Sequence, residues 1–332
     1  MEDITFIIGL LCLLLIGLDI FWTTLWVDGG SGPVSRWIAK AVWKTFKSIG
    51  RNHPKFLSLA GPFILVFTLL SWIVLLWLGW LLLFLGDPQA ITDTRDNQPI
   101  RFIELLYFTG FTIFTLGIGD YVPKAGFWQV ATVIASGNGM LFITLGVTYV
   151  LSVLNAVTLQ RSFASTITGL GMSGSEFVKK TWNGDRFRNT DLLLNSASSQ
   201  LNTLTAQHKA YPILHHYHPS DLDQSATIGV TILDEALTLL ELGIQENHQP
   251  DFLYIEEARS SISSYLKVIP ANIRKKASQV PPAPDVDGLR KQGLPVVDAD
   301  AFADRLHDLK ERRAILLSLV TSDARSWPTN EK

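Results

Sequence analysis

The stretch Thr115-Leu116-Gly117-Ile118-Gly119-Asp120 decides the fold, because it places two glycines one residue apart directly after an apolar segment. Residues 101–114 form that segment, and they are too few to cross a bilayer as a helix, which takes about 20 residues. We therefore expect a re-entrant helix over 101–114. Irregular backbone at membrane depth is tolerated only where protein buries it or where it lines a water-filled path. Glycines at alternate positions permit positive φ, so successive carbonyl groups can turn toward one axis.

Three long apolar segments surround this stretch. Residues 4–27 carry one charge, residues 62–86 carry none, and residues 125–160 contain no Asp, Glu, Lys or Arg. Each segment is long enough to cross a bilayer as a helix. The sequence therefore predicts an all-α membrane protein.

We interpret the first apolar segment as a retained N-terminal transmembrane helix, residues 1–28. It does not resemble a signal peptide, because Glu2 and Asp3 stand where a signal peptide has basic residues. Its one charge, Asp19, is expected near the helix end, where it reaches the lipid headgroups. A buried functional carboxylate is the alternative.

Charge divides the 332 residues into two halves. Residues 1–160 hold 9 basic and 9 acidic residues, whereas residues 161–332 hold 19 and 21, a density close to that of soluble domains. We expect a membrane half followed by a soluble half. The net charge of −2 argues against a basic nucleic-acid surface, and the single Cys12 excludes an intrachain disulfide and a cysteine-based metal site.

A basic stripe follows the first membrane helix. It predicts an amphipathic helix within 29–58 that lies on the membrane surface and ends near Pro54. Because basic loops stay in the cytoplasm, we expect the N-terminus outside and residues 161–332 in the cytoplasm of a multi-pass protein of the cell membrane. The residues of the stripe are Arg36, Lys40, Lys44, Lys47, Arg51 and Lys55.

The order of apolar helix, short re-entrant helix, T-x-G-x-G-D and apolar helix resembles the pore module of the potassium channel family. The string Thr115–Asp120, followed by Tyr121-Val122-Pro123, is similar to the second pore loop of two-pore-domain potassium channels. The resemblance covers about a third of the chain, as a pore domain over 59–160. It implies four parts, which are an outer helix (62–86), a pore helix (101–114), a filter (115–120) and an inner helix (127–158).

The resemblance also implies the chemistry. Carbonyl oxygens of Thr115, Leu116, Gly117 and Ile118, with the Thr115 hydroxyl, would replace the water that a potassium ion sheds. Asp120 would attract cations at the outer mouth. One chain supplies one strip, so a closed ring requires a homotetramer in the lipid bilayer. No cofactor is expected apart from potassium ions in the filter.

Four residues depart from the family pattern. Ile118 replaces the usual Tyr, Tyr107 and Phe108 stand where Trp is usual, and Phe111 lies where Glu or Val is often found. They predict an apolar cuff with few hydrogen bonds around the filter. We expect selectivity for potassium over sodium, with a weakly selective cation pore as the main alternative.

The inner helix contains glycines, and Gly139 matches the family's hinge position. A glycine there permits bending, but it equally permits close helix packing, and both interpretations stay open. The family geometry implies a cavity lined by Met140, Ile143, Val147 and Thr148.

Residues 161–332 predict a mostly helical cytoplasmic domain. Apolar stripes at helical spacing begin at Leu194, Leu233 and Phe302, the last interrupted by Arg313. The series Gly169-x-Gly171-x-x-Gly174 matches a dinucleotide fingerprint, but no strand precedes it, so we favour a flexible link. Four histidines (His208, His215, His216, His218) are interpreted as surface and packing residues rather than as a metal or proton sensor.

Three classes of function are compatible with a membrane half and a soluble half. An ion channel is favoured, because a membrane-anchored sensor or scaffold with a degenerate pore need not keep both glycines, Thr115 and Asp120. An enzyme is not favoured, because the sequence contains no nucleophile–base–acid constellation. A voltage sensor is not favoured either, because the basic stripe is too polar to span a membrane. The gating stimulus and the ligand of the cytoplasmic domain have no signature in the sequence.

Overall fold

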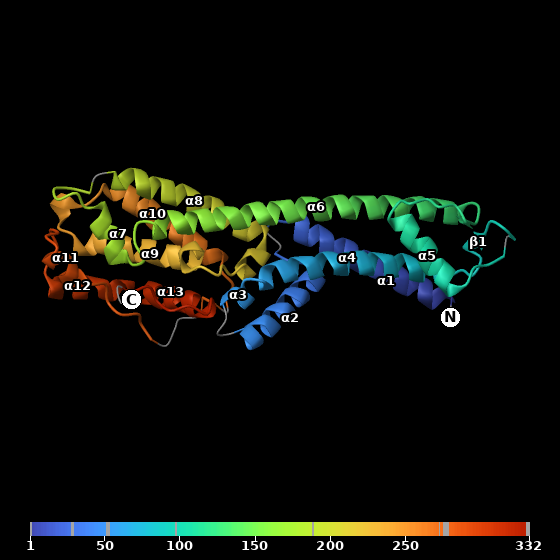
Figure 1. Cartoon of the computed structure of the whole chain (residues 1–332), viewed down its shortest axis with the longest axis horizontal. Coiled ribbons are helices and arrows are strands. Elements are labelled where there is room, and N and C mark those ends of the chain that lie inside the picture. Colours follow the sequence, from blue (N-terminus) through green and yellow to red (C-terminus); the bar gives the residue numbers. More distant parts are fainter. Residues whose placement is uncertain are drawn as a thin grey trace. The chain divides into compact units, whose positions relative to one another are not determined.

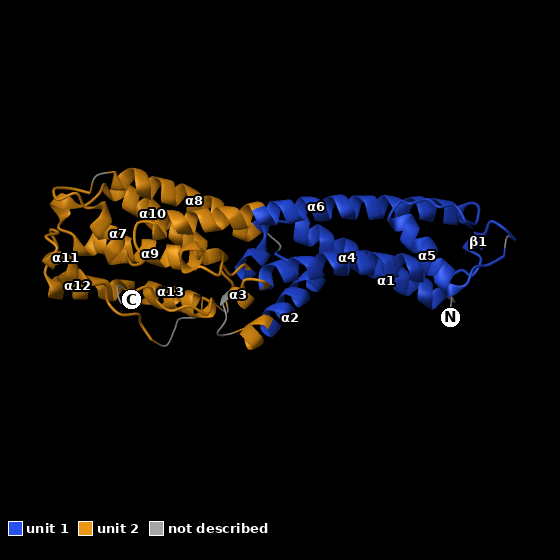
Figure 2. Ribbon diagram, viewed as in Figure 1, with its two compact units in different colours: residues 1–45, 60–154, 210–216 blue, residues 46–59, 155–209, 217–332 orange. Residues whose placement is uncertain are grey.

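The computed structural model of the chain describes residues 2–27, 30–50, 54–96, 98–187, 189–271, 273–274 and 279–329. It divides into two compact units (Figures 1 and 2). Unit 1 comprises residues 1–45, 60–154 and 210–216, and unit 2 comprises residues 46–59, 155–209 and 217–332.

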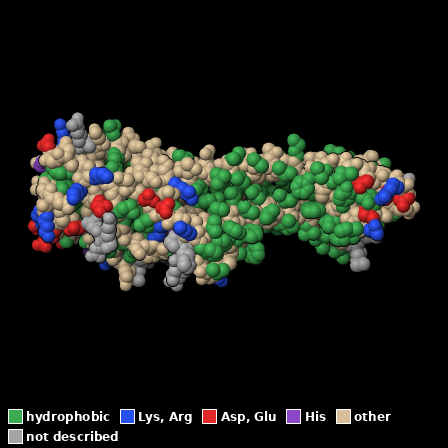
Figure 3. Space-filling model, viewed as in Figure 1, with side chains coloured by type: hydrophobic (Ala, Val, Ile, Leu, Met, Phe, Trp, Pro, Cys, Tyr) green, Lys and Arg blue, Asp and Glu red, His purple; other side chains and the backbone are tan. Residues whose placement is uncertain are grey.

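Among the residues that the structure describes, three helices of unit 1 are long and apolar enough to cross a membrane. Apolar side chains cover its visible face, and charged side chains gather at the end that carries β1 (Figure 3). The prediction of an all-α membrane protein is confirmed. The helices are α1 (Glu2–Thr24), α2 (Pro33–Gly50), α4 (Ala60–Leu85), α5 (Phe102–Ile113), α6 (Phe127–Thr168, which continues into unit 2) and the short 3-10 helix η1 (Pro212–His216).

Two glycines allow α1 to lie directly against α4. A Cβ added at Gly9 would come within 2.6 Å of the Leu83 backbone nitrogen, and one at Gly79 within 2.8 Å of the Leu13 side chain. Small residues at such a crossing let helix backbones approach, which is the main source of packing energy inside a bilayer. The N-terminal helix is therefore an integral part of the unit.

Asp19 was expected to reach the lipid headgroups, and that prediction is wrong. Its side chain is fully buried. Oδ1 accepts hydrogen bonds from the backbone nitrogens of Val34 (2.7 Å) and Ser35 (3.3 Å), and Oδ2 accepts from the Ser35 hydroxyl (2.6 Å) and Trp72 Nε1 (2.9 Å). The carboxylate thus caps the N-terminus of α2 and joins it to α1 and α4.

The basic stripe lies mostly on α2, which ends at Gly50, before Pro54. Arg36, Lys40 and Lys44 are exposed, and Trp37 beside them is exposed as well. Arg51 lies outside the described residues. A further short helix, α3 (Pro54–Leu57), follows.

Two three-residue strands were not predicted. β1 (Ile91–Asp93) pairs antiparallel with β2 (Tyr121–Pro123), with Asp93 opposite Tyr121. The backbone nitrogen of Lys124 extends the ladder to the Ala90 carbonyl (2.8 Å). The pair ties the segment before α5 to the segment after the glycine-rich strip, so both ends of the loop are fixed.

Unit 2 is a bundle of short helices around one apolar core, as the stripes predicted. Leu194, Leu201, Leu233 and Leu237 are all completely buried in it. Its further elements are α7 (Gly174–Thr181), α8 (Thr190–Ala210), η2 (Leu222–Gln224), α9 (Ala226–Thr238), the π-helix η3 (Leu239–Gly243), η4 (Glu246–His248), α10 (Phe252–Val268), α11 (Val286–Lys291), α12 (Ala299–Leu306), η5 (His307–Leu309) and α13 (Lys310–Ser322).

Charged side chains of α9 and α13 are buried inside this bundle. Asp234 pairs with Arg259 (3.0 Å) and with Arg312 (2.7 Å). Arg313, which interrupts an apolar stripe in the sequence, pairs with Glu235 (2.9 Å). Removing one partner of such a buried pair is strongly destabilising, because the other charge is left uncompensated.

Candidate functional site

The glycine-rich strip begins where the short helix α5 ends. Arg101 starts that helix, because its backbone nitrogen donates to Glu104 Oε2 (2.7 Å). After Ile113, the Thr115 nitrogen bonds the Thr112 carbonyl (3.1 Å) and the Leu116 nitrogen bonds the Phe111 carbonyl (2.8 Å). The chain thus leaves the helix through a tight turn, with the negative end of the helix dipole at the start of the strip.

Positive and negative φ angles alternate along the strip. Thr115 (57°), Gly117 (59°) and Gly119 (85°) have positive φ, whereas Leu116 and Ile118 do not. In such an alternating backbone, successive N–H groups point to one side and successive carbonyls to the other. Among the described residues, no donor contacts the carbonyl oxygens of residues 116–119. The strip therefore presents a row of free main-chain oxygens.

The outer end of the strip is held by the strand pair. The Asp120 carbonyl accepts hydrogen bonds from the Thr94 backbone nitrogen (3.1 Å) and hydroxyl (2.9 Å). In the part of the chain that the structure describes, Asp120 Oδ1 is buried without a hydrogen-bond partner. The role of Thr94 as a donor to Asp120 could not be predicted from the sequence, because it depends on the pairing of β1 with β2.

Ion pairs neutralise two of the acids near this end. Arg95 bonds Asp93 (2.7 Å) and Arg101 bonds Glu104 (2.5 Å). Hydrogen bonds from these arginines lower the pKa of Asp93 and of Glu104 below their ordinary values. Asp120 forms no such pair within the described chain and is the one acid of the strip itself.

An aromatic cluster lies behind the strip. Phe108 and Phe111 are buried, and their rings meet edge to face with centroids 5.2 Å apart. Tyr107 contacts Phe111 (5.2 Å) and Tyr121 (6.1 Å) in the same way. Edge-to-face ring pairs stabilise a site beyond their buried area, so the strip has an apolar support on one side.

The strip is not fully covered by its own chain. Leu116 is 67% exposed and Ile118 53% exposed. A hollow of about 350 Å³ lies between α5 and α6, and its walls include Phe108, Phe111 and Tyr121 of the aromatic cluster as well as Thr115, Gly117 and Gly119 of the strip. The side chains of the strip therefore lack cover from their own chain.

Gly139 packs against the end of the short helix. A Cβ added there would collide with the Ile113 carbonyl oxygen, whereas one added at Gly137 would meet nothing within 4 Å. This contact agrees with the packing interpretation, and α6 is helical throughout. A hinge at Gly139 remains a prediction. The residues predicted to line a cavity, Met140, Ile143, Val147 and Thr148, are all exposed.

The other candidate residues do not assemble into a site. His208 packs edge to face on Tyr265 (5.6 Å), and His218 Nδ1 bonds Asp323 (2.8 Å). His216 lies 5.2 Å from the Trp43 ring, and burial lowers its pKa to about 3. Within the described ranges, no group of three His, Cys, Asp or Glu residues could hold a metal.

The possible dinucleotide fingerprint lies in the wrong context. Gly169 follows the end of helix α6 rather than a strand, and Ser173 caps the eight-residue helix α7. The fingerprint requires a strand before its first glycine, so this motif is a helix-to-helix link.

Helices apolar enough to cross a membrane, a short helix between two of them and a row of free carbonyls are features of an ion channel pore. Residues 64–156 match a family model described as an ion channel. The chain is also 44% identical over 326 residues, 98% of its own length and 96% of the relative's, to the uncharacterized membrane protein YdjJ of Bacillus subtilis (strain 168). No solved structure matches the chain. The chain therefore belongs to the family of this membrane protein, and its residues 64–156 form an ion channel domain.

Proposed function

We propose that the protein is a potassium-selective channel that conducts down the electrochemical gradient through a pore formed by four copies of the chain. The observation that carries the proposal is the strip 115–120, whose φ angles alternate in sign and whose carbonyls at 116–119 have no donor among the described residues. Such oxygens are what a potassium ion needs when it sheds its water.

The surroundings of the strip suit a cation. Helix α5 ends at the strip, so the negative end of its dipole favours positive charge there. Thr115 adds a hydroxyl at the inner end. Asp120, unpaired within the described chain, supplies negative charge at the outer end.

Four copies are proposed because one chain provides only one wall of the path. Coordination of a cation from all sides requires closed symmetry around it. The exposed side chains of Leu116 and Ile118 offer apolar surface for neighbouring copies. We further propose that the basic helix α2 and unit 2 face the cytoplasm, with the N-terminus outside.

Flux of potassium into liposomes that hold the purified protein tests the proposal. Gly117→Ala forces a side chain onto a residue with φ of 59°, which costs on the order of 1–2 kcal/mol in each copy. We expect the flux to fall at least tenfold. Gly126→Ala is the matched control, because Gly126 also has positive φ (90°) and open surroundings but lies outside the strip. Equal flux through wild type and Gly117→Ala would refute conduction along this strip.

A weakly selective cation channel is the second candidate. Ile118 supplies no hydroxyl to brace the filter, and the described neighbours of the strip, Phe108 and Phe111, are apolar. A filter held by few hydrogen bonds would discriminate ions of different size less sharply. Reversal potentials under opposed potassium and sodium gradients separate the two candidates. Equal permeabilities would favour the weakly selective pore.

A further inference from the structure

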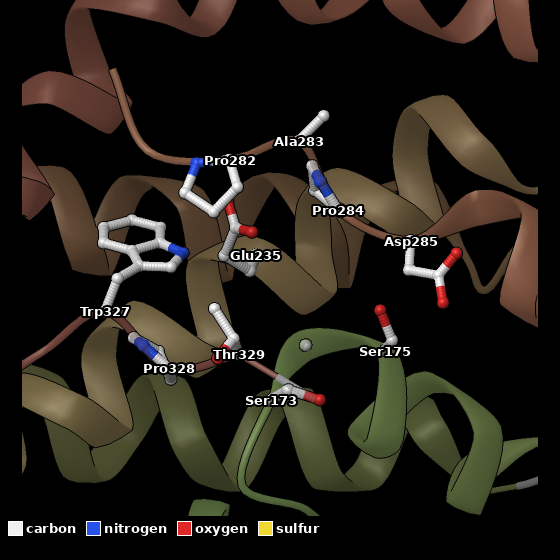
Figure 4. Close-up of a pocket in the computed structure, with 11 residues that line it drawn as sticks. Ser173, Ser175, Glu235, Pro282, Ala283, Pro284, Asp285, Trp327, Pro328 and Thr329 are labelled. Atoms are coloured by element: carbon white, nitrogen blue, oxygen red, sulfur yellow. The ribbon is translucent and has the colours of Figure 1, made fainter. Parts of the chain in front are cut away.

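Unit 2 contains a cavity of about 360 Å³ that the proposed conduction does not use. It lies between the start of α7, the middle of α9, the proline-rich segment before α11 and the segment that follows α13 (Figure 4). Sites for small molecules are concave, of this size, and combine apolar walls with a few polar groups.

One wall of the cavity carries a buried carboxylate. The Glu235 side chain is 7% exposed and the Arg313 side chain 2%, and Oε1 of Glu235 accepts from Arg313 Nε (2.9 Å). The guanidinium also donates to the carbonyls of Pro281 (3.4 Å) and Pro282 (2.5 Å). These bonds hold the carboxylate in one orientation.

The second carboxylate oxygen is available to a ligand. Oε2 of Glu235 has no hydrogen-bond partner in the described part of the chain, and it is not enclosed by protein. Figure 4 shows the Glu235 side chain between Pro282 and Thr329, at the wall of the cavity. A side chain buried to this degree with an unpaired oxygen offers an acceptor to an amine.

Hydrogen-bond donors face the same space from α7. The hydroxyl of Ser173 accepts from the Glu176 nitrogen (3.2 Å), which caps the helix. The backbone nitrogens of Gly174 and Ser175 have no acceptor among the described residues. A Cβ added at Gly174 would lie 2.7 Å from Glu235 Cβ, so these N–H groups start beside the carboxylate. Free N–H groups at a helix start bind anionic oxygens.

The remaining walls are apolar or acidic. The Trp327 ring lies with its centroid 5.9 Å from Arg313 Cζ and borders the cavity together with the prolines. Asp285 adds a second carboxylate at the rim, where its Oδ1 caps α11 through the Gly288 nitrogen (2.7 Å). Among the residues that the structure describes, no Lys or Arg lines the cavity.

We propose that this cavity binds a small α-amino acid. Its ammonium group would contact Glu235 Oε2, its carboxylate would accept from the Gly174 and Ser175 nitrogens, and its side chain would pack against Trp327. A zwitterion satisfies both kinds of polar wall without adding net charge to the buried ion pair. The proposal concerns binding to unit 2 and does not depend on whether the pore conducts.

Binding is tested on the full-length protein in detergent by isothermal titration calorimetry with each of the twenty protein amino acids. Acetate and methylamine serve as probes of the two ends alone. We expect at least one amino acid to bind with saturation, and both half-ligands to bind at least tenfold more weakly. Absence of binding by every amino acid, or acetate or methylamine binding as tightly as the best amino acid, would overturn the proposal.

Two variants locate the site. Ser175→Leu fills the mouth from the first turn of α7 without touching the buried pair, and should weaken binding at least tenfold. Ser326→Leu, at an exposed neighbour of Trp327 that does not line the cavity, is the control and should bind as wild type. Unchanged affinity in Ser175→Leu would place the bound amino acid elsewhere and refute the assignment. Glu235→Gln, if it folds, should lose binding as well.

Discussion

Asp19 gives the sharpest prediction for stability, because four donors converge on its two oxygens. Asp19→Asn keeps one carbonyl oxygen for the nitrogens of Val34 and Ser35, but it turns an amide NH₂ toward Trp72 Nε1. The indole N–H then faces a donor inside protein, and a buried donor without an acceptor costs about 1–3 kcal/mol. The replaced bonds were also charge-assisted, which adds to the loss.

The expected result is a lower melting temperature. About 2 kcal/mol corresponds to a shift of roughly 4–8 °C for a unit of this size. Far-UV circular dichroism of the purified protein in detergent measures the shift. Leu18→Ala, at the exposed neighbour of Asp19, is the control and should change the melting temperature little.

A double-mutant cycle separates the cap from general damage. Trp72→Phe removes the indole donor, so Asp19→Asn should cost about 1 kcal/mol less in that background than in wild type. Additive effects of the two substitutions would mean that the bond between Asp19 and Trp72 contributes nothing. A wild-type melting temperature for Asp19→Asn would refute the role of the carboxylate as a cap for α2.

Three further predictions concern other parts of unit 1. Gly139→Ala should lower the melting temperature and the potassium flux, because the added Cβ collides with the Ile113 carbonyl. Gly137→Ala is the control and should lower neither, because the space around Gly137 is open. Equal effects of the two substitutions would contradict the packing of Gly139 against Ile113. The pKa of His216 is lowered to about 3, so the folded state favours the neutral ring and the free energy of unfolding falls as pH drops below 6.5, by about 2 kcal/mol at pH 5. Denaturant titrations at pH 7 and pH 5 should show this loss of stability. In His216→Phe the loss between pH 7 and pH 5 should be smaller. Ile118→Tyr should raise the ratio of potassium to sodium permeability measured from reversal potentials, and an unchanged ratio would mean that a hydroxyl there does not brace the filter.

Local patterns predicted the parts of the fold that depend on local forces. The short helix expected over 101–114 is present as α5 (Phe102–Ile113), and its re-entrant placement in the membrane stays a prediction. The positive φ angles at Gly117 and Gly119 follow from residue type. The positive φ angle of Thr115 could not be predicted from residue type, because Thr115 is not a glycine.

Pairings between distant residues could not be predicted. Asp19 finds Trp72 53 residues along the chain, and Arg313 finds Glu235 78 residues away. A lone charge in an apolar run signals that some partner exists, but not which one. The strands β1 and β2 are too short for an alternation of apolar and polar residues to mark them as strands. Their pairing depends on how both ends of the loop are held.

The energetics of the strip argue for several copies. Its carbonyls at 116–119 receive no hydrogen bond from the described residues, and unpaired carbonyls in hydrocarbon cost several kcal/mol each. They therefore cannot face lipid and must face water or cations. The same chain places the buried Phe108 and Phe111 on the walls of the hollow beside the strip but leaves Leu116 and Ile118 open. One wall cannot exclude lipid from an ion path, so we infer that several copies of this strip close around the path. Chemical cross-linking in native membranes should therefore yield species up to the tetramer. Only monomers after cross-linking would contradict this inference.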